Sequence, residues 1–328
     1  MELFPANPNP RSSVMSSEQR RAVDFKETDA MSYDAHVEDF DRFSSALTKP
    51  FARRMIAMAN ISAGQRVLDI GTGTGVLALE AAKAVGNEGQ CIGIDLSEKM
   101  LASAKASARQ TNLTERTEFK VMDAESLEFK PASFDAVVSL FALLHFPNPS
   151  NALKEMFRVL KPGGTLVVAV GSPPSWFSWQ GVIHAANLIP QLVARLRGLE
   201  LVAPQFLNQL VQECIPAQDE PEVSSLAQAG RNRSRIVPRL IRNAGFVNLR
   251  QCWEGRQTVI ETPADFWRIQ RTFSSIARKR LNRATPDQVA GVRAKFDELC
   301  HKVLSRGGRL IYPVGAFFVA AERSSQTR

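Results

Sequence analysis

The sequence predicts an α/β fold: a doubly wound, mainly parallel sheet of seven strands with a helical cap insertion. Three observations predict this fold. Short apolar segments alternate with helical patterns at regular spacing through residues 66–170, which is typical of parallel strands joined by crossover helices. Several of these segments end beside an acidic residue, and ligands of doubly wound sheets bind at such strand ends. The alternation stops after residue 170, which predicts the insertion.

The composition is that of an ordinary globular protein. With 328 residues, 44% hydrophobic and 23% charged, the chain is long enough for one large domain with an insertion. Its four cysteines show neither C-x-x-C spacing nor a cluster with histidine, so we expect no disulfide framework and no metal site. No apolar run is long enough for a membrane span, and the first 30 residues lack a secretory signal. These features predict a cytoplasmic protein.

The net charge of +8 is unevenly distributed. Residues 1–170 hold 19 Lys and Arg against 21 Asp and Glu, whereas residues 171–328 hold 22 against 12. The basic second half favours an acidic substrate, a peripheral contact with an anionic membrane, or nucleic acid. A solvated basic face is the alternative. The sequence predicts no particular oligomeric state.

The N-terminal region divides into a tail and a helical segment. Residues 1–30 are rich in Pro, Ser, Asn and charge, which predicts a mobile tail. Aromatic residues then alternate with acids up to Phe43, and residues 49–58 have the pattern of an amphipathic helix that leads into the first strand. We therefore expect residues 31–65 to form helices before the core.

A glycine-rich turn joins the first strand to its helix, with glycines at Gly71, Gly73 and Gly75. Glycine lets the backbone turn sharply, and the missing side chains let a ligand lie against the main chain at the helix N-terminus. A dinucleotide-binding turn is the alternative, but its third glycine stands where this chain has Val76. Asp69 has no role in binding a pyrophosphate, whereas its carboxylate could hold an ammonium group.

The string Asp69-x-Gly71-x-Gly73-x-Gly75 after an apolar strand resembles the first motif of the class I S-adenosylmethionine-dependent methyltransferases. The resemblance implies a Rossmann-like methyltransferase fold, S-adenosylmethionine as the cofactor, and a cofactor-binding core over residues 66–170 that includes Thr72. In that family an N-terminal segment folds over the cofactor as a lid. Residues 31–65 would then be lid helices and Tyr33 a lid residue, with a surface or packing role as the alternative.

The second strand ends at Asp95, 24 residues after Gly71 and close to the spacing at which an acid binds a ribose diol. A carboxylate accepts two hydrogen bonds from adjacent hydroxyls. A helix N-cap is the alternative role, but Ser97 suits it already. Leu96 and Met100 would then lie beside an adenine ring, or else belong to the helix core.

The third predicted strand, residues 117–121, leads to Asp123. In the resembled family an acid at this point accepts a hydrogen bond from the adenine amino group, and the next backbone amide, here that of Ala124, meets the ring. An aspartate at a strand end is also a common turn former, so the prediction depends on its register with the two earlier motifs. Ser139 in the fourth strand completes the predicted cofactor-binding set.

Residues 133–170 predict a fourth strand, a helix over 149–160 that ends at Lys-Pro-Gly-Gly, and a fifth strand over 165–170. The stretch Arg-Val-Leu-Lys-Pro-Gly-Gly before a strand resembles the subfamily of ubiquinone and menaquinone C-methyltransferases and related small-molecule methyltransferases. The resemblance implies a small-molecule acceptor.

Residues 171–228 predict a helical cap whose apolar residues would form an acceptor pocket, or would serve packing alone. Its predicted substrate-binding residues are Trp176, Trp179 and His184. Residues 229–328 predict the remainder of the core with inserted substrate-side helices: a basic helix at 231–242, a sixth strand at 247–253, a pair of helices at 263–304 and a last strand at 311–320.

S-adenosylmethionine carries an activated methyl group, so a protein that uses it must mainly align the acceptor atom and exclude water. His145, just after the fourth strand, is the candidate general base for an acceptor that must lose a proton. A structural histidine is the alternative. Tyr33 and His36 are further candidate substrate-binding residues. The sequence thus predicts methyl transfer to an apolar or aromatic small molecule.

Two other functions stay open. The basic second half suits a methyltransferase of RNA or other nucleic acid, but the fourth strand does not end in the N/D-P-P-Y/F string of enzymes that methylate nucleic-acid amino groups. A non-catalytic cofactor-binding protein is the second alternative, because the motifs predict binding rather than turnover.

Overall fold

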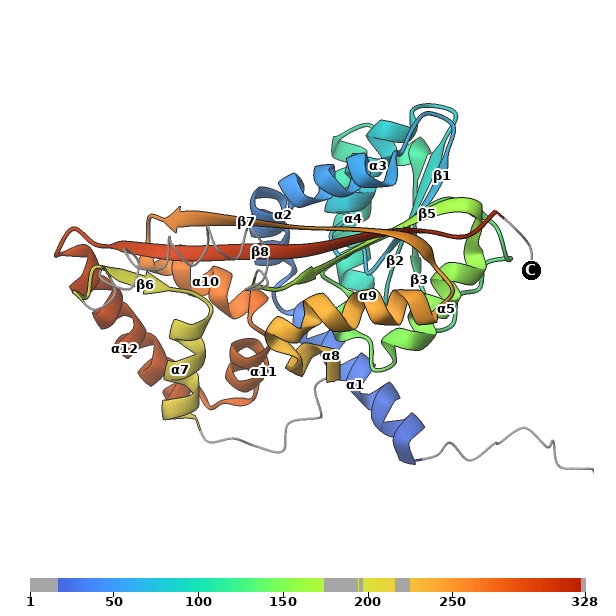
Figure 1. Cartoon of the computed structure of the whole chain (residues 1–328). Helices are drawn as coiled ribbons and strands as arrows, with labels where there is room; N and C mark the ends of the chain where they lie inside the picture. The colour runs from blue at the N-terminus through green and yellow to red at the C-terminus, as the bar shows by residue number, and fades with distance from the viewer. Residues whose placement is uncertain (1–16, 174–193, 195–196, 216–224, 326–328) are drawn as a thin grey trace, which may run out of the picture.

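The computed structural model describes residues 17–173, 194, 197–215 and 225–325. Within them one sheet has the order β3-β2-β1-β4-β5-β8-β6, with β7 on the other edge of β8 (Figure 1). The strands are β1 Arg66–Ile70, β2 Gln90–Asp95, β3 Thr117–Val121, β4 Phe134–Leu140, β5 Leu160–Gly171, β6 Glu200–Val202, β7 Val247–Ile260 and β8 Arg309–Glu322. Strands β1 to β5 are parallel, whereas β8 is antiparallel to β5 and β7. The predicted doubly wound sheet is confirmed, and the short β6 is an addition to its seven strands.

Helices cover both faces of this sheet. On one face, α2 (Val37–Ala59), α3 (Val76–Val85) and α4 (Glu98–Gln110) share a buried core with Val67 of β1. On the other face, α5 (Pro149–Val159) and α9 (Arg233–Asn243) share a core with Leu68. Successive side chains of a strand point to opposite faces, so neighbouring apolar residues of β1 enter different cores.

Strands β7 and β8 extend beyond the predicted segments and run as a long ribbon out of the core sheet (Figure 1). Beside the far end of this ribbon, α7 (Gln205–Cys214), α10 (Pro263–Phe273) and α12 (Pro286–Leu304) pack around a third apolar core. The prediction of two helices over residues 263–304 is wrong, because α11 (Ser275–Arg283) lies between α10 and α12. Ser274 caps α11 and Thr285 caps α12, so the chain begins a new helix at each of these points.

The described part of the predicted cap, residues 171–228, is not purely helical. It contains β6 as well as α7 and α8 (Ser225–Gln228). Because β6 pairs in parallel with β8, this part of the insertion extends the sheet. The predicted substrate-binding residues Trp176, Trp179 and His184 lie outside the described residues.

Helix α1 (Ser17–Asp34) corrects the prediction of a tail over residues 1–30, of which residues 1–16 lie outside the described residues. The composition of this segment favoured disorder, but Phe25 and Asp29 are each only 6% exposed. Tertiary contacts therefore stabilise a helix that local sequence does not specify. Together α1 and α2 provide the helices expected before the core.

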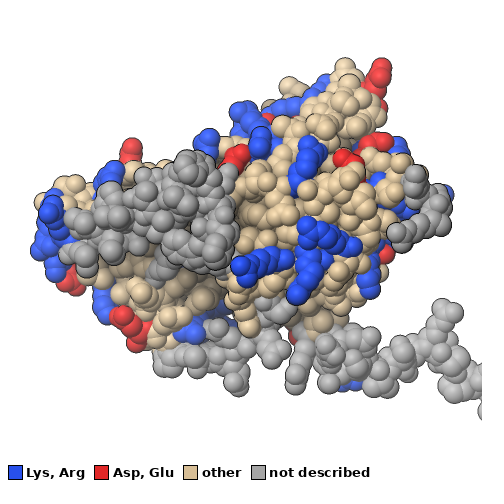
Figure 2. Space-filling model, viewed as in Figure 1, with Lys and Arg blue, Asp and Glu red and all other residues tan. Residues whose placement is uncertain are grey.

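Helix α9 has the predicted basic, amphipathic character. Its buried residues are Val237, Pro238 and Ile241, and its exposed arginines are Arg235, Arg239 and Arg242. Figure 2 shows Lys and Arg side chains gathered on the face that carries this helix. None of the helices in the described parts of the chain is both long enough and apolar enough to cross a membrane.

Candidate functional site

The glycine-rich turn lies at the carboxyl end of β1. Gly71 has φ +71°, and a Cβ atom added to it would lie 2.2 Å from the Cβ of Ala142, so both the backbone angle and the space require glycine. The backbone amides of Gly71 and Thr72 both donate to the carbonyl of Ile94, at 2.9 Å each. The turn is thereby fixed against β2, and its residues Gly71 and Gly73 lie on the wall of a cavity.

Asp69 lies beneath this turn and is 1% exposed. Thr72 Oγ1 donates a 2.7 Å hydrogen bond to its Oδ2. Burial, reinforced by the nearby charge of Asp95, raises the pKa of Asp69 to about 7. A cationic ligand group beside this buried carboxyl would stabilise its ionised form, and the carboxylate would in turn attract the ligand.

Asp95 ends β2 and also lines the cavity. Its two carboxylate oxygens accept hydrogen bonds from the backbone amides of Gly73, at 2.9 Å, and Ser97, at 3.0 Å. Burial raises the pKa of Asp95 despite these bonds. Ser97 is the N-cap of α4, since its Oγ accepts from the amide of Met100. The alternative of Asp95 as the helix cap is therefore excluded.

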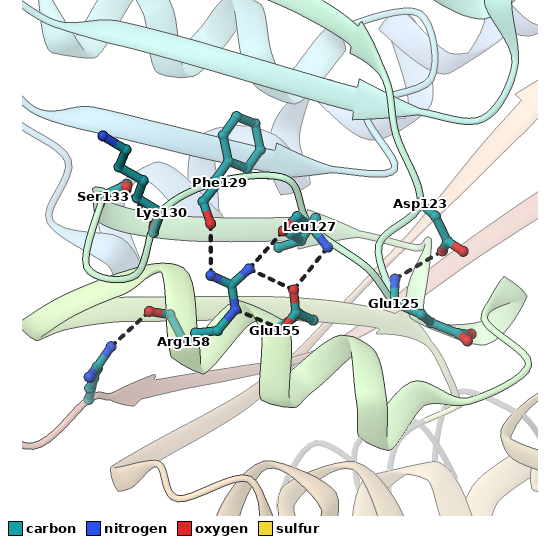
Figure 3. A network of polar contacts seen from close by, with 9 residues as sticks. Asp123, Glu125, Leu127, Phe129, Lys130, Ser133, Glu155 and Arg158 are labelled. Carbon is teal, nitrogen blue, oxygen red and sulfur yellow. Dashed lines mark hydrogen bonds and ion pairs between the residues drawn. The ribbon is translucent and has the colours of Figure 1, made fainter. Parts of the chain in front are cut away.

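Asp123 lies in the loop between β3 and β4, which a side-chain pair of α5 holds in place (Figure 3). Arg158 donates to the carbonyls of Leu127 and Phe129, at 2.7 Å each, and Glu155 accepts from the amide of Leu127 at 2.9 Å. Arg158 and Glu155 also pair with each other. Side chains of one rigid helix thus anchor the loop that presents Asp123 and Ala124 to the cavity.

Helix α1 contacts the same loop from the other side of the cavity. Lys26 Nζ lies 2.7 Å from Asp123 Oδ2 and 2.9 Å from a carboxylate oxygen of Glu125. Burial alone would lower the pKa of Lys26, but these two bonds raise it. A second contact joins Ser97 Oγ to Asp34 at 2.7 Å. Helix α1 therefore lines the cavity, although the sequence analysis assigned most of its residues to the tail.

His145 ends the short helix η2 (Leu143–His145), which follows β4. Its Nδ1 lies 2.8 Å from Oδ2 of Asp29, and its Nε2 lies 3.5 Å from the hydroxyl of Tyr33. Both partners belong to α1. The structure thus brings together His145 and Tyr33, which the sequence analysis proposed separately, and adds Asp29 as a partner of His145.

One large cavity, of about 1770 Å³, joins these features. It exceeds the roughly 300–1000 Å³ of a typical small-molecule site, so it has room for two ligands side by side. The predicted residues that line it are Tyr33, Asp69, Gly71, Thr72, Gly73, Asp95, Leu96, Met100, Asp123, Ala124 and His145.

Among the predicted residues that the structure describes, three do not line this cavity. Gly75 is the N-cap of α3 with a left-handed backbone and packs near Ala104. Ser139 is fully buried, and its hydroxyl donates to the carbonyl of Ile70, which joins β4 to β1. His36 is buried away from the cavity lining, and its Nε2 lies 3.3 Å from Oδ1 of Asn282.

The far part of the cavity has residues that the sequence analysis missed. They include Phe206, Arg233, Trp253, Arg256 and Tyr312. The Trp253 indole donates to the carbonyl of Ser172 at 2.7 Å, and its ring fills the space above Gly255 and Gly315. A tryptophan with one glycine two residues further along its own strand and another on the paired strand was a usable signal, but it required the pairing of β7 with β8. We call this part of the cavity the acceptor half and the part around Asp69, Asp95 and Asp123 the cofactor half.

Comparison with known proteins agrees with this geometry. A family model described as a methyltransferase domain matches residues 61–218. A demethylmenaquinone methyltransferase of Porphyromonas gingivalis is 34% identical over 180 residues, which cover 54% of this chain and 73% of that protein. One of Lactobacillus johnsonii is 31% identical over 201 residues, or 60% of this chain and 80% of that protein. The chain belongs to the methyltransferase family.

Two further matches of this methyltransferase give weaker support, one because it covers a smaller share of the relative and one because its sequence identity is low. It is 35% identical over 134 residues to a ubiquinone/menaquinone biosynthesis C-methyltransferase of a Marinomonas species, but the match spans only 53% of that protein and 41% of this chain. A solved structure of a Bacillus halodurans protein assigned to the methyltransferases covers 83% of this chain and 98% of its own, with 21% identity and a TM-score of 0.50. This likeness concerns the fold alone.

S-adenosylmethionine is the cofactor of this methyltransferase, and the residues of the cofactor half fit it. The exposed main chain of the glycine turn leaves room for an extended ligand. The raised pKa of the buried Asp69 carboxyl fits a cationic partner. Asp95 keeps free lone pairs beside its two backbone bonds, which suits a ligand diol.

Proposed function

We propose that this methyltransferase acts on an aromatic or otherwise apolar small molecule bound in the acceptor half of the cavity. The observation that supports this proposal is the continuity of the two halves: one cavity contains both the acids beside the glycine turn and the aromatic residues of β7, β8 and α7. An acceptor that lies between them can meet the cofactor without passing through water.

The proposed cofactor contacts follow from the residue chemistry. Asp95 accepts the ribose hydroxyls and Asp69 pairs with the ammonium group. Asp123 accepts from the adenine amino group, the amide of Ala124 meets the ring, and Leu96 and Met100 pack beside it. Lys26 already occupies one oxygen of Asp123, so the adenine amino group must share this carboxylate with α1.

The acceptor class is inferred from the lining and from the relatives. Phe206, Trp253 and Tyr312 provide aromatic surface, and Arg233 and Arg256 add positive charge at the same part of the cavity. The related proteins are named for demethylmenaquinone and for ubiquinone and menaquinone biosynthesis. A hydroxylated aromatic ring, such as a reduced quinone, fits both observations, and its ring carbon is the proposed methylated atom.

When bound, S-adenosylmethionine supplies a methyl group activated on a sulfonium. The protein aligns the acceptor ring with that group and excludes water. His145 is the proposed general base, because its Nε2 faces Tyr33 at the cavity wall, where an acceptor hydroxyl can approach. Tyr33 would position that hydroxyl.

The test is an acceptor screen with isotopically labelled cofactor and mass spectrometry. We expect a reduced naphthoquinone with a free ring position to yield methylated product and equimolar S-adenosylhomocysteine. The same compound with that ring position blocked by a methyl group is the matched control and should yield neither. Methylation of RNA instead, with steep salt dependence, would replace this proposal with the nucleic-acid function. Cofactor binding with no S-adenosylhomocysteine from any acceptor would indicate a non-catalytic protein.

A further inference from the structure

Three parts of the chain that are far apart in sequence meet at Asp29. The residue belongs to α1 and is 6% exposed. Its Oδ2 lies 2.8 Å from Nδ1 of His145, and its Oδ1 lies 2.7 Å from Nζ of Lys279 in α11. The guanidinium of Arg278, which is fully buried, lies 4.0 Å from the same Oδ1 and 3.6 Å from the centre of the Tyr33 ring.

These neighbours decide the charge of Asp29. Burial alone would raise the pKa of this carboxyl, but the charges and hydrogen bonds of His145 and Lys279 hold it well below its ordinary value. Asp29 is therefore a carboxylate and can only accept hydrogen bonds. A nitrogen 2.8 Å from a carboxylate oxygen must carry a proton to make that contact favourable.

We propose that Asp29 is the positioning residue of a carboxylate–imidazole pair: it accepts the Nδ1 proton of His145 and so leaves Nε2 unprotonated on the cavity side, beside the Tyr33 hydroxyl. This inference rests on the proposed function for its chemical use. When an acceptor hydroxyl meets Nε2, its O–H bond breaks, the proton joins Nε2 and the electron pair stays on oxygen. After the ring carbon takes the methyl group, its hydrogen leaves as a proton, the C–H electron pair restores the aromatic ring, and the oxygen takes up a proton, so one proton is released in total. The imidazolium formed lies against the Asp29 carboxylate, and after the reaction it returns its proton to solvent.

Docking of α1 does not explain this contact, because other residues already attach the helix. Lys26 pairs with Asp123 and Glu125, and Asp34 accepts from Ser97. Asp29 is one of several residues of α1 that contact α11, and it belongs to α1 itself, so the pair is complete only when α1 lies against the cavity. Release of α1 would open the cavity and separate the base from its carboxylate in the same motion.

The first test needs neither acceptor nor cofactor. Nitrogen-15 NMR of the histidine rings at alkaline pH, where imidazoles are neutral, reports which ring nitrogen carries the proton. The chain has four histidines, and the signals lost in His145→Gln assign this one. We expect the Nδ1-protonated tautomer in the wild type. In Asp29→Asn the amide can donate to Nδ1, which should shift the proton to Nε2.

Two variants separate positioning from attachment of α1. Lys279→Met removes the shorter of the two ion pairs that Asp29 makes with α11 but keeps the carboxylate and Arg278, so the Nδ1-protonated tautomer should persist. Asp24→Asn changes an exposed acid of the same helix and should leave the tautomer unchanged. A wild-type Nε2-protonated tautomer, or the same tautomer in the wild type and Asp29→Asn, would overturn the proposal.

The kinetic test uses the full-length enzyme with the acceptor found in the screen. Asp29→Asn should lower kcat by about 10²–10⁴-fold, the range for loss of a general base or its correct tautomer, and leave the cofactor Kd within about twofold. An equal loss in Lys279→Met with an unchanged tautomer would show that Asp29 serves attachment, and would also overturn the proposal. Failure of the acceptor screen leaves the tautomer measurement intact, so the failures of the two proposals are distinguishable.

Discussion

The two halves of the cavity are built in different ways. In the cofactor half, Asp69, Gly71, Asp95 and Asp123 all lie at or just after the carboxyl ends of the adjacent strands β1, β2 and β3. In the acceptor half and around the proposed general base His145, the contacts join residues that are distant in sequence, such as Asp29 and Lys279. The first half depends mainly on backbone geometry, and the second depends on packed side chains from separate elements.

This difference indicates how each half tolerates change. A turn at the end of a buried strand keeps its shape as long as its glycines, Asp69 and Asp95 remain. We therefore expect substitutions at only a few positions to change cofactor affinity. Side chains brought together by packing can be replaced without loss of the fold. We therefore expect substitutions at many positions of the acceptor half to change acceptor selectivity. The predictions below test whether the two halves are energetically separate.

The largest expected effect is that of Asp95→Ala. It removes the acceptor of two proposed ribose hydrogen bonds, each worth about 1.5–3 kcal/mol to a charged group, so the cofactor Kd should rise by about 100-fold or more. Titration calorimetry measures this value. The matched control is Asp135→Ala, which removes an acid at the amino end of β4 that pairs with Lys161, far from the cavity lining. Similar losses in both variants would contradict the ribose assignment.

The second effect is that of pH through Asp69, and it is smaller when counted per unit of pH. Burial raises the pKa of this carboxyl in the folded protein to about 7, from the ordinary aspartate value of 3.8. The folded state therefore holds a proton that the unfolded state has lost, and the cofactor-free protein should lose stability as pH rises from about 4 to about 7. The cofactor ammonium favours the ionised carboxylate, so affinity should rise by up to about tenfold per pH unit up to about 7 and then level off.

The matched variant for this prediction is Asp69→Asn, whose carbonyl can still accept from Thr72. The difference between the wild type and this variant isolates Asp69 from other titrating groups. Thermal melting and calorimetry across the pH range measure stability and affinity. If both proteins show the same pH dependence, Asp69 does not bind the ammonium group.

The smallest expected effect is that of Tyr312→Phe. Tyr312 lines the acceptor half, and burial raises the pKa of its hydroxyl, so this group is a neutral donor. Loss of one hydrogen bond of about 1 kcal/mol should raise the acceptor KM about fivefold and leave the cofactor Kd unchanged. Steady-state kinetics and calorimetry separate the two constants. A parallel loss of cofactor affinity would show that the halves are coupled.

The cofactor half could be predicted because its residues are local in sequence. Asp69, Asp95 and Asp123 follow strands whose apolar pattern is plain, and parallel neighbours place such ends together. Two predicted cofactor-binding residues, Gly75 and Ser139, do not line the cavity, and the sequence does not show why. Ser139 was assigned from its strand, but the sequence does not say that its hydroxyl satisfies the carbonyl of Ile70. Gly75 belongs to the motif, yet its role is to begin α3.

The acceptor half could not be predicted to the same degree. Composition made residues 17–30 resemble a tail, because the burial of Phe25 and Asp29 depends on partners that include a helix some 250 residues away. Long strands β7 and β8 bring Trp253 and Tyr312 to the cavity only through their pairing and its register. No local pattern encodes that register.

The sequence by itself determined the doubly wound sheet, the glycine turn and the acids of the cofactor half, because strand periodicity and glycine geometry are local properties. Only the tertiary structure decided that α1 lies over the cavity and that Asp29 meets His145 and Lys279. Those contacts form between charged side chains that are unfavourable to bury singly, so they exist only where folding brings all the partners to one place.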